Sequence, residues 1–188
     1  ATRNVWTMEA LKPYIGKERW ERMYTARSLR DSGARLAGGS DWPVDPLYPW
    51  TQVQSAIDRM GLYGEVKPLG IHEAITRRQS LRMHTRGTAY QLHQEKNTGT
   101  VEVGKLADLV MLDRDVASCP VSEIKDAVPQ LTMVGGDVTF DITTSAGKAA
   151  RRALESAASA KAITGRIRHD QLGGRHSGCP CTTASQDK

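Results

Sequence analysis

The feature that most constrains the fold is a helical pattern that leads directly into a short apolar segment closed by Trp42-Pro43. Apolar residues recur at helical spacing over residues 17–32, and Gly33 favours the end of a helix there. Residues 34–41 then form a strand pattern, which the proline ends because it cannot donate to a sheet. A helix followed by a strand and a loop is the unit of a parallel α/β sheet, so the sequence predicts an α/β fold.

Further patterns follow along the chain. Two helices are predicted over residues 51–61 and 72–93, and an alanine-rich helix over 147–163. Apolar and alternating runs predict strands at 100–103, 109–112, 131–134 and 137–140. Gly135-Gly136 lies between the last two runs and is a two-residue hairpin signal. The second half therefore predicts a small antiparallel β module.

The length of 188 residues limits how much of a large α/β architecture the chain can hold. A complete (β/α)8 barrel needs about 250 residues, so barrel elements found here would belong to part of one. The mean hydropathy is −0.47, and the chain has no apolar run near the roughly 18 residues of a membrane span. We therefore expect a soluble protein and exclude a membrane protein.

The positive charge is confined to the C-terminal tail. The net charge is +5, but residues 1–146 hold 18 basic and 18 acidic residues, whereas residues 147–188 hold 8 and 3. A body of zero net charge provides no long-range field for phosphate, and a short basic tail is more often a solvated extension. Nucleic-acid binding is therefore not favoured.

The three cysteines do not form a disulfide scaffold, because three cannot all pair and Cys179 and Cys181 are separated by a single residue. With His176, and His169 as a fourth ligand, they suggest a soft-metal site in the tail. Closed zinc sites usually have two or more residues between paired cysteines, so Cys-Pro-Cys is a weak signal for one.

The chain begins with Ala1 rather than methionine, and no cationic start followed by an apolar stretch opens it. Two explanations stay open: a targeting segment was removed, or the true N-terminus is missing. We expect a cytoplasmic location.

Asp41 has the most suggestive position for chemistry. In a parallel α/β arrangement, functional side chains gather where a strand ends and a loop begins. Gly38 and Gly39 would allow a ligand or a second backbone to approach closely, and Trp42 would add an apolar wall. A carboxylate there can bind a cation or accept a proton from a metal-bound water. Spacing alone favours a plainer role, that of a turn or cap residue.

Two sequence blocks carry a resemblance to a known family. Residues 29–44, with their core Gly-Ser-Asp-Trp-Pro-Val, resemble the last barrel strand of the amidohydrolase superfamily, specifically amidohydrolase family 3. Residues 99–113 resemble the return of that family's chain into its β-sandwich domain, and residues 134–138 its closing hairpin. The resemblance covers residues 20–141 and leaves the tail unexplained.

The resemblance implies that the chain is the C-terminal portion of a larger enzyme. The implied fold is the C-terminal part of a (β/α)8 TIM-type barrel with strands of a small β-sandwich. The implied domains are the last αβ units and following helices at 1–96, sandwich strands at 97–145, and a basic, partly disordered tail at 146–188.

The implied activity is metal-dependent hydrolysis of a non-peptide C–N bond in a small amide or formamide-like substrate. A divalent metal, expected to be zinc, would activate a water molecule. By its position, Asp41 would be the proton shuttle to that water and a candidate metal ligand. Gly39, Trp42 and Pro43 would shape the substrate pocket.

The sequence also departs from the family. Such enzymes carry a His-X-His on the first strand and further metal-binding histidines, whereas no two histidines here lie two residues apart. His72, His84 and His93 fall in a predicted helix, where surface or packing roles are expected. We therefore expect the chain to be inactive alone, with a homo-oligomer or a partner chain supplying the rest of the barrel.

Two alternatives stay open beside the enzyme. A non-catalytic fragment or companion subunit would keep its barrel strands only for packing, and a tail-mediated anion binder would lose affinity steeply with salt. Lys105 and Asp108 are expected to be structural, one at a turn and the other binding backbone N–H groups at a strand entry.

Overall fold

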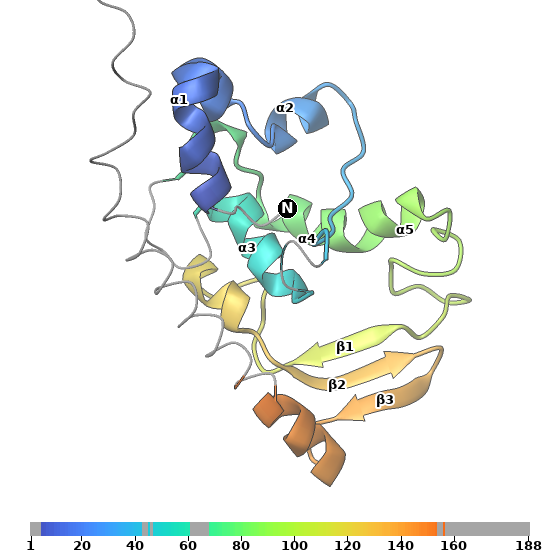
Figure 1. The fold of residues 1–188 in the computed structure, drawn as a ribbon. Coiled ribbons are helices and arrows are strands. Elements are labelled where there is room, and N and C mark those ends of the chain that lie inside the picture. Colours follow the sequence, from blue (N-terminus) through green and yellow to red (C-terminus); the bar gives the residue numbers. More distant parts are fainter. Residues whose placement is uncertain (1–4, 43–44, 46, 61–67, 154–155, 157–188) are drawn as a thin grey trace, which may run out of the picture. The chain divides into compact units, whose positions relative to one another are not determined.

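The computed structural model describes residues 5–42, 45, 47–60, 68–153 and 156. The chain divides into two compact units, Ala1–Asp141 and Ile142–Lys188. The first unit holds helices α1 to α5 and the only sheet of the described residues (Figure 1). In the second unit, residues 145–153 and 156 are helical, which confirms the start of the alanine-rich helix; residues 154–155 and 157–163 of that predicted helix lie outside the described residues.

The helix predicted over residues 17–32 is two helices instead of one. Helix α1, Val5–Glu21, is kinked at Gly16, and helix α2, Ala26–Asp31, begins after a turn. Tyr24 in that turn has a left-handed backbone, with φ of 56°. The prediction of one continuous helix was therefore wrong, because periodicity does not reveal a single left-handed residue that breaks the backbone ladder.

Buried Arg59 stabilises this turn from a distant part of the chain. Its guanidinium donates to the carbonyl oxygens of Met23, Tyr24 and Leu69 at distances of 2.8, 3.0 and 2.9 Å. Arg59 is the left-handed C-cap of helix α3, Pro49–Asp58. The helix predicted at 51–61 is thus confirmed two residues early, with Tyr48 rather than Thr51 as its N-cap.

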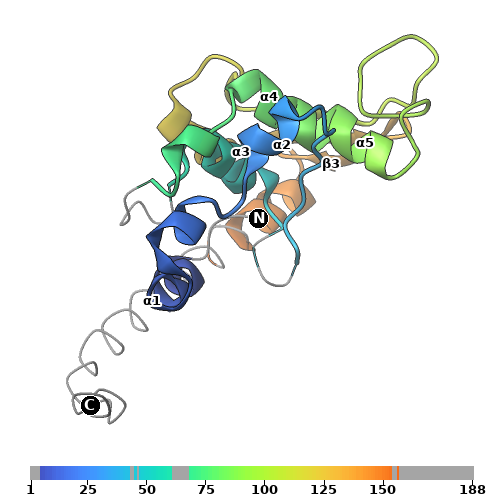
Figure 2. The same cartoon turned by 90° about the horizontal axis from the view of Figure 1, so that it is seen from above.

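The helix predicted over residues 72–93 is present but interrupted. It consists of a 3-10 turn η1 at Ile71–Glu73, helix α4 at Arg77–Arg82, a π-helix η2 at Met83–Gly87 and helix α5 at Thr88–Gln91. Thr76 begins α4 with a capping box completed by Gln79. Figure 2 shows α4 and α5 in one line, beside α2 and α3.

Residues 34–41 do not form the predicted strand. They run as an irregular segment, neither helix nor strand, from α2 past α4 and the π-helix (Figure 1). Gly38 N–H donates to the Met83 carbonyl at 3.2 Å, so this segment bonds to a helix where the prediction needed a neighbouring strand. A strand requires such a neighbour, and the sheet of the described residues lies elsewhere in the chain.

The sheet is antiparallel, with strand order β1-β2-β3. Strands β1 (Leu109–Leu112), β2 (Pro129–Val134) and β3 (Asp137–Asp141) confirm three of the four predicted strands. Gly135 and Gly136 both have positive φ, 61° and 94°, as the predicted primed turn requires. The hairpin is confirmed, and β1 lies at an open edge of the described sheet.

Asp108 and Lys105 have the structural roles expected of them. Asp108 accepts the Gly135 N–H at 2.7 Å and the Thr98 hydroxyl at 3.2 Å, which fastens the hairpin turn to the entry of β1. Lys105 donates to the Glu95 carbonyl at 2.9 Å. Residues 100–103, in contrast, are not the predicted strand: Val101 and Val103 are almost fully exposed and no strand pairs with them in the described sheet.

The core of the first unit is small and shared among short elements. Trp20 and Leu69 are buried against Ile15 and Met23 near the α1–α2 turn. Helix α3 packs against α4 and against the 3-10 helix η3, Val121–Asp126, whose Ile124 is fully buried. In the part of the chain described here, no helix has both the length and the apolar character to cross a membrane.

Replacing Arg59 by lysine is expected to destabilise the fold by about 2–3 kcal/mol, because one ammonium cannot reach all three carbonyls that the guanidinium bonds, including that of buried Leu69. Urea denaturation followed by circular dichroism measures this loss. The matched control is Arg82→Lys at an exposed helix position, expected to change stability by less than about 0.5 kcal/mol. Equal effects from both variants would contradict the role given to Arg59.

Candidate functional site

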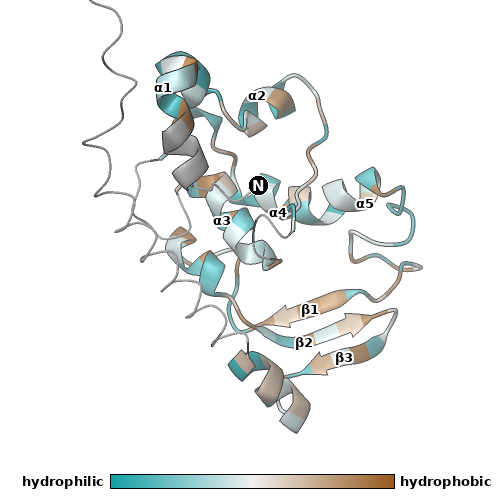
Figure 3. Cartoon of the chain, viewed as in Figure 1, coloured by the Kyte–Doolittle hydropathy of each residue, from teal (hydrophilic) through white to brown (hydrophobic). Residues whose placement is uncertain are grey.

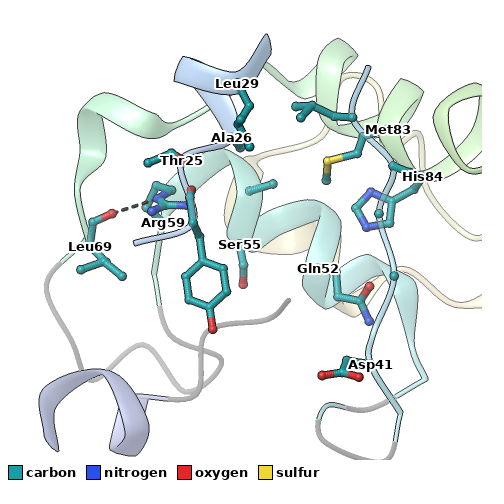
Figure 4. A pocket seen from close by; sticks show the side chains of 16 residues that line it. Thr25, Ala26, Leu29, Asp41, Gln52, Ser55, Arg59, Leu69, Met83 and His84 are labelled. Carbon is teal, nitrogen blue, oxygen red and sulfur yellow. Dashed lines mark hydrogen bonds between the residues drawn. The ribbon is translucent and has the colours of Figure 1, made fainter. Parts of the chain in front are cut away.

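A cavity of about 370 Å³ lies between the 34–41 segment, helices α2 and α3 and the π-helix η2 (Figure 4). Its wall is largely apolar, with Leu29, Leu36 and Met83 among the lining side chains. The polar lining residues include Asp41, Gln52, Arg59 and His84 (Figure 4). A mainly apolar cavity with a few polar groups is the usual form of a small-molecule site.

Asp41 is an exposed residue at the cavity wall, at the end of the 34–41 segment. Its backbone is left-handed, with φ of 55°, a conformation that aspartate tolerates better than most residues. In Figure 4, Asp41, Gln52 and His84 lie toward one side of the cavity, and Arg59 and Leu69 toward the other. Asp41 is thus exposed to solvent and also lines the cavity.

The other residues of the predicted pocket are placed differently. Gly39 lines the cavity and has nothing within 4 Å of where a Cβ would lie. Trp42 is 56% exposed and is not among the described residues that line it. Pro43, and the tail residues His169, His176, Cys179 and Cys181, lie outside the described residues.

His84 forms the part of the cavity wall that lies against the 34–41 segment. Its Nδ1 lies 3.0 Å from the Ser80 carbonyl oxygen, which can only accept, so Nδ1 carries the proton of the neutral ring. Burial lowers the pKa of His84 below its ordinary value, and the bond to Ser80 only partly opposes this effect. A packing role for this histidine agrees with the sequence-based expectation.

Arg59 and Tyr24 are among the cavity residues that sequence reasoning missed. The Arg59 guanidinium donates to three backbone carbonyls and so shapes one end of the cavity. Burial, followed by the charge of Asp45, raises the pKa of the Tyr24 hydroxyl and keeps it neutral. A lone arginine after a helix carries no signal in the sequence, because its partners lie up to 36 residues away.

The described residues do not fit a metal centre by themselves. No group of three or more histidine, cysteine, aspartate or glutamate side chains is close enough to hold a metal ion in the part of the chain that the structure covers. Zinc needs three or four such ligands, and Asp41 alone would supply one.

Comparison with known proteins identifies the family. The model of the Amidohydrolase family matches residues 3–140, which is most of the chain. The chain belongs to the amidohydrolase family. The α/β class and the family resemblance predicted from the sequence are thereby confirmed.

Two curated relatives resemble this amidohydrolase-family chain. It is 32% identical over 124 residues to the N-substituted formamide deformylase of Arthrobacter pascens, across 66% of this chain and 22% of that protein. It is 27% identical over 134 residues to the Bacillus subtilis protein named YtcJ, across 68% of this chain and 24% of that protein. The chain thus spans about a quarter of the length of the curated relatives it matches.

A solved structure is also similar. The amidohydrolase from Thermotoga maritima matches with a TM-score of 0.48 and 22% identity, over 62% of this chain and 26% of that chain.

Acid is expected to destabilise the wall of the cavity through Glu73. This buried carboxylate accepts the Ser28 N–H at 2.8 Å and the Ser28 hydroxyl. Burial alone would raise the pKa of Glu73, but these hydrogen bonds outweigh it and the pKa lies below its ordinary value of 4.5. A lowered folded pKa gives a stabilisation that is complete above the unfolded value and is lost as the pH falls through the folded value.

Urea midpoints measured from pH 6 to about pH 3 test this expectation. The wild-type midpoint should fall with acid, and Glu73→Gln should flatten part of that fall. Glu18→Gln, at a helix position with an 88% exposed side chain, is the matched control and should leave the slope unchanged. The same slope in all three proteins would refute the assignment to Glu73.

Proposed function

We propose that this chain is the C-terminal segment of a metal-dependent amidohydrolase that hydrolyses a non-peptide C–N bond in a small amide or formamide-like substrate. The observation that carries the proposal is the family match over residues 3–140, joined to an exposed carboxylate at the wall of a mainly apolar cavity. The identity to a formamide deformylase favours the substrate class.

In this proposal the chain contributes the end of a (β/α)8 barrel and part of a β-sandwich. The family match over residues 3–140 supports the first assignment, and residues 34–41 lie between α2 and α3, where a barrel strand is expected, although they are not a strand in the structure. The antiparallel strands β1, β2 and β3 support the second. The proposed domains are 1–96 and 97–145, with a tail at 146–188.

Asp41 is the proposed proton shuttle. Its carboxylate accepts a proton from the attacking water and donates it to the departing amine nitrogen, so that the C–N bond breaks with a neutral leaving group. The cavity beside it, with Gly39 at its wall, would hold the small apolar part of the substrate. The contribution of Trp42 and Pro43 to the substrate pocket stays a prediction from the sequence.

The proposed metal, zinc by the family's usual preference, would polarise the substrate and activate the water. Because the described residues do not make a three-ligand site, its other ligands are assigned to parts of the enzyme outside them. The tail set of Cys179, Cys181 and His176 stays a separate prediction, as does a cytoplasmic location.

A second candidate is a non-catalytic fragment or companion subunit. The described residues lack a three-ligand group, and strand β1 leaves an open edge with half-exposed Val110 and Met111, which would suit pairing with a partner chain or a second copy. Apolar residues lie along all three strands in Figure 3.

Asp41→Asn is expected to lower turnover of an N-substituted formamide by about 10²–10⁴-fold in the enzyme that contains this chain, because the amide cannot accept the proton. Amine release measures turnover, and elemental mass spectrometry of the same samples should show unchanged metal content. Asp31→Asn, an exposed carboxylate of α2 outside the cavity, is the matched control and should retain turnover.

Near-normal turnover of Asp41→Asn would remove the shuttle role. A metal-loaded wild-type enzyme that hydrolyses no amide would favour the companion subunit instead. Loss of metal in Asp41→Asn would make Asp41 a ligand in addition to any proton-transfer role.

A further inference from the structure

Residues between Met83 and Thr88 hold the 34–41 segment in place at Gly38. The Gly38 N–H donates to the Met83 carbonyl at 3.2 Å, and the Gly38 carbonyl accepts the Thr88 hydroxyl at 3.1 Å. The His84 ring fills the space on the third side, 2.6–2.8 Å from where a Cβ of Gly38 would lie. We call Met83, His84 and Thr88 the Gly38 clamp.

The clamp is built on an irregular turn. Residues Met83–Gly87 form a π-helix between α4 and α5, a geometry that is rare and often marks functional positions. The Thr88 hydroxyl lies 3.1 Å from both the Gly38 and the Met83 carbonyl oxygens, so its single proton is shared between the 34–41 segment and the π-helix. The Met83 carbonyl also accepts the Gly38 N–H and thus joins the π-helix to the segment.

Close approach of the two backbones requires a glycine in the turn. Gly87 has an ordinary helical φ of −65°, so its backbone conformation would suit any residue. A Cβ at Gly87, however, would overlap the Leu36 carbonyl oxygen, which is backbone and cannot swing aside. Gly87 is therefore needed for space, and it lets the segment lie directly on the helix.

His84 is itself held from behind. Its Nδ1–H donates to the Ser80 carbonyl, and the fully buried Ser80 hydroxyl donates to the Val53 carbonyl of α3 at 2.9 Å. A chain of contacts therefore runs from α3 through Ser80 and His84 to Gly38. This buried network, and not only the contact with the segment, holds the His84 ring in its orientation.

We propose that the Gly38 clamp positions Asp41, with Thr88 and His84 as positioning residues for proton transfer. The clamp acts three residues before the carboxylate, on the segment that ends in the left-handed Asp41. This inference rests on the proposed function, in which Asp41 moves the proton. A general base must be held within a fraction of an ångström of its productive place, so loosening the clamp reduces turnover without removing a reacting group.

Two threonines of the turn give a matched test. Thr88→Val removes the hydroxyl that reaches Gly38, whereas Thr85→Val removes one that donates only to the Leu81 carbonyl of its own helix, at 2.9 Å. Both changes keep the side-chain shape. Thr88→Ser keeps the hydroxyl and serves as the conservative rescue.

Two readouts are taken on each variant of the enzyme that contains this chain. Amide hydrogen exchange at Gly38, followed by NMR, reports the clamp without any need for activity. For Thr88→Val we expect exchange about tenfold faster and kcat for an N-substituted formamide about tenfold lower, with KM nearly unchanged. Thr85→Val and Thr88→Ser should stay close to wild type in both readouts.

Equal Gly38 exchange in Thr88→Val and Thr85→Val would overturn the clamp. Faster exchange with unchanged kcat would overturn the positioning role, even if the clamp exists. Failure of the proposed function is separate: full turnover in Asp41→Asn, or no turnover in the metal-loaded wild type, would overturn the positioning of a catalytic group whatever the exchange rates show.

Discussion

The buried guanidinium of Arg59 is the interaction on which the arrangement of the first unit most depends. It joins the end of α3 to the α1–α2 turn and to Leu69, three regions that share only a small apolar core. Each of the three contacts meets a backbone carbonyl in irregular backbone, so the arginine stabilises these turns as well as the tertiary packing. The left-handed Tyr24 turn and one end of the cavity follow from this contact.

A second constraint sets the other end of the cavity. The 34–41 segment lies against the π-helix η2 because Gly38 and Gly87 lack side chains where the two backbones meet. This contact holds the segment three residues before Asp41, which is itself exposed to solvent. In the proposed function this combination suits proton transfer, which needs both a defined position and access to the reacting molecule.

The first unit exposes several large apolar residues, and the chain spans about a quarter of the length of its curated relatives. Val103 and Val101 are almost fully exposed, and the strand pattern at 100–103 has no pairing partner in the described sheet. A three-stranded sheet is near the minimum that is stable in water, and it usually needs a covering layer. The alternating pattern of residues 100–103 is therefore typical of a strand in a sheet larger than the one described.

The sequence by itself determined the family, the β-hairpin and the approximate extents of the helices after residue 49. These depend on local signals: the Gly-Ser-Asp-Trp-Pro-Val block, the Gly135-Gly136 turn and the 3.6-residue period. Only the tertiary structure decided that residues 34–41 lie on a helix instead of in a sheet, that Arg59 stabilises the left-handed turn between α1 and α2, and that His84 packs on Gly38. Each of these depends on contacts between residues 35 to 50 positions apart, whose energies no local pattern encodes.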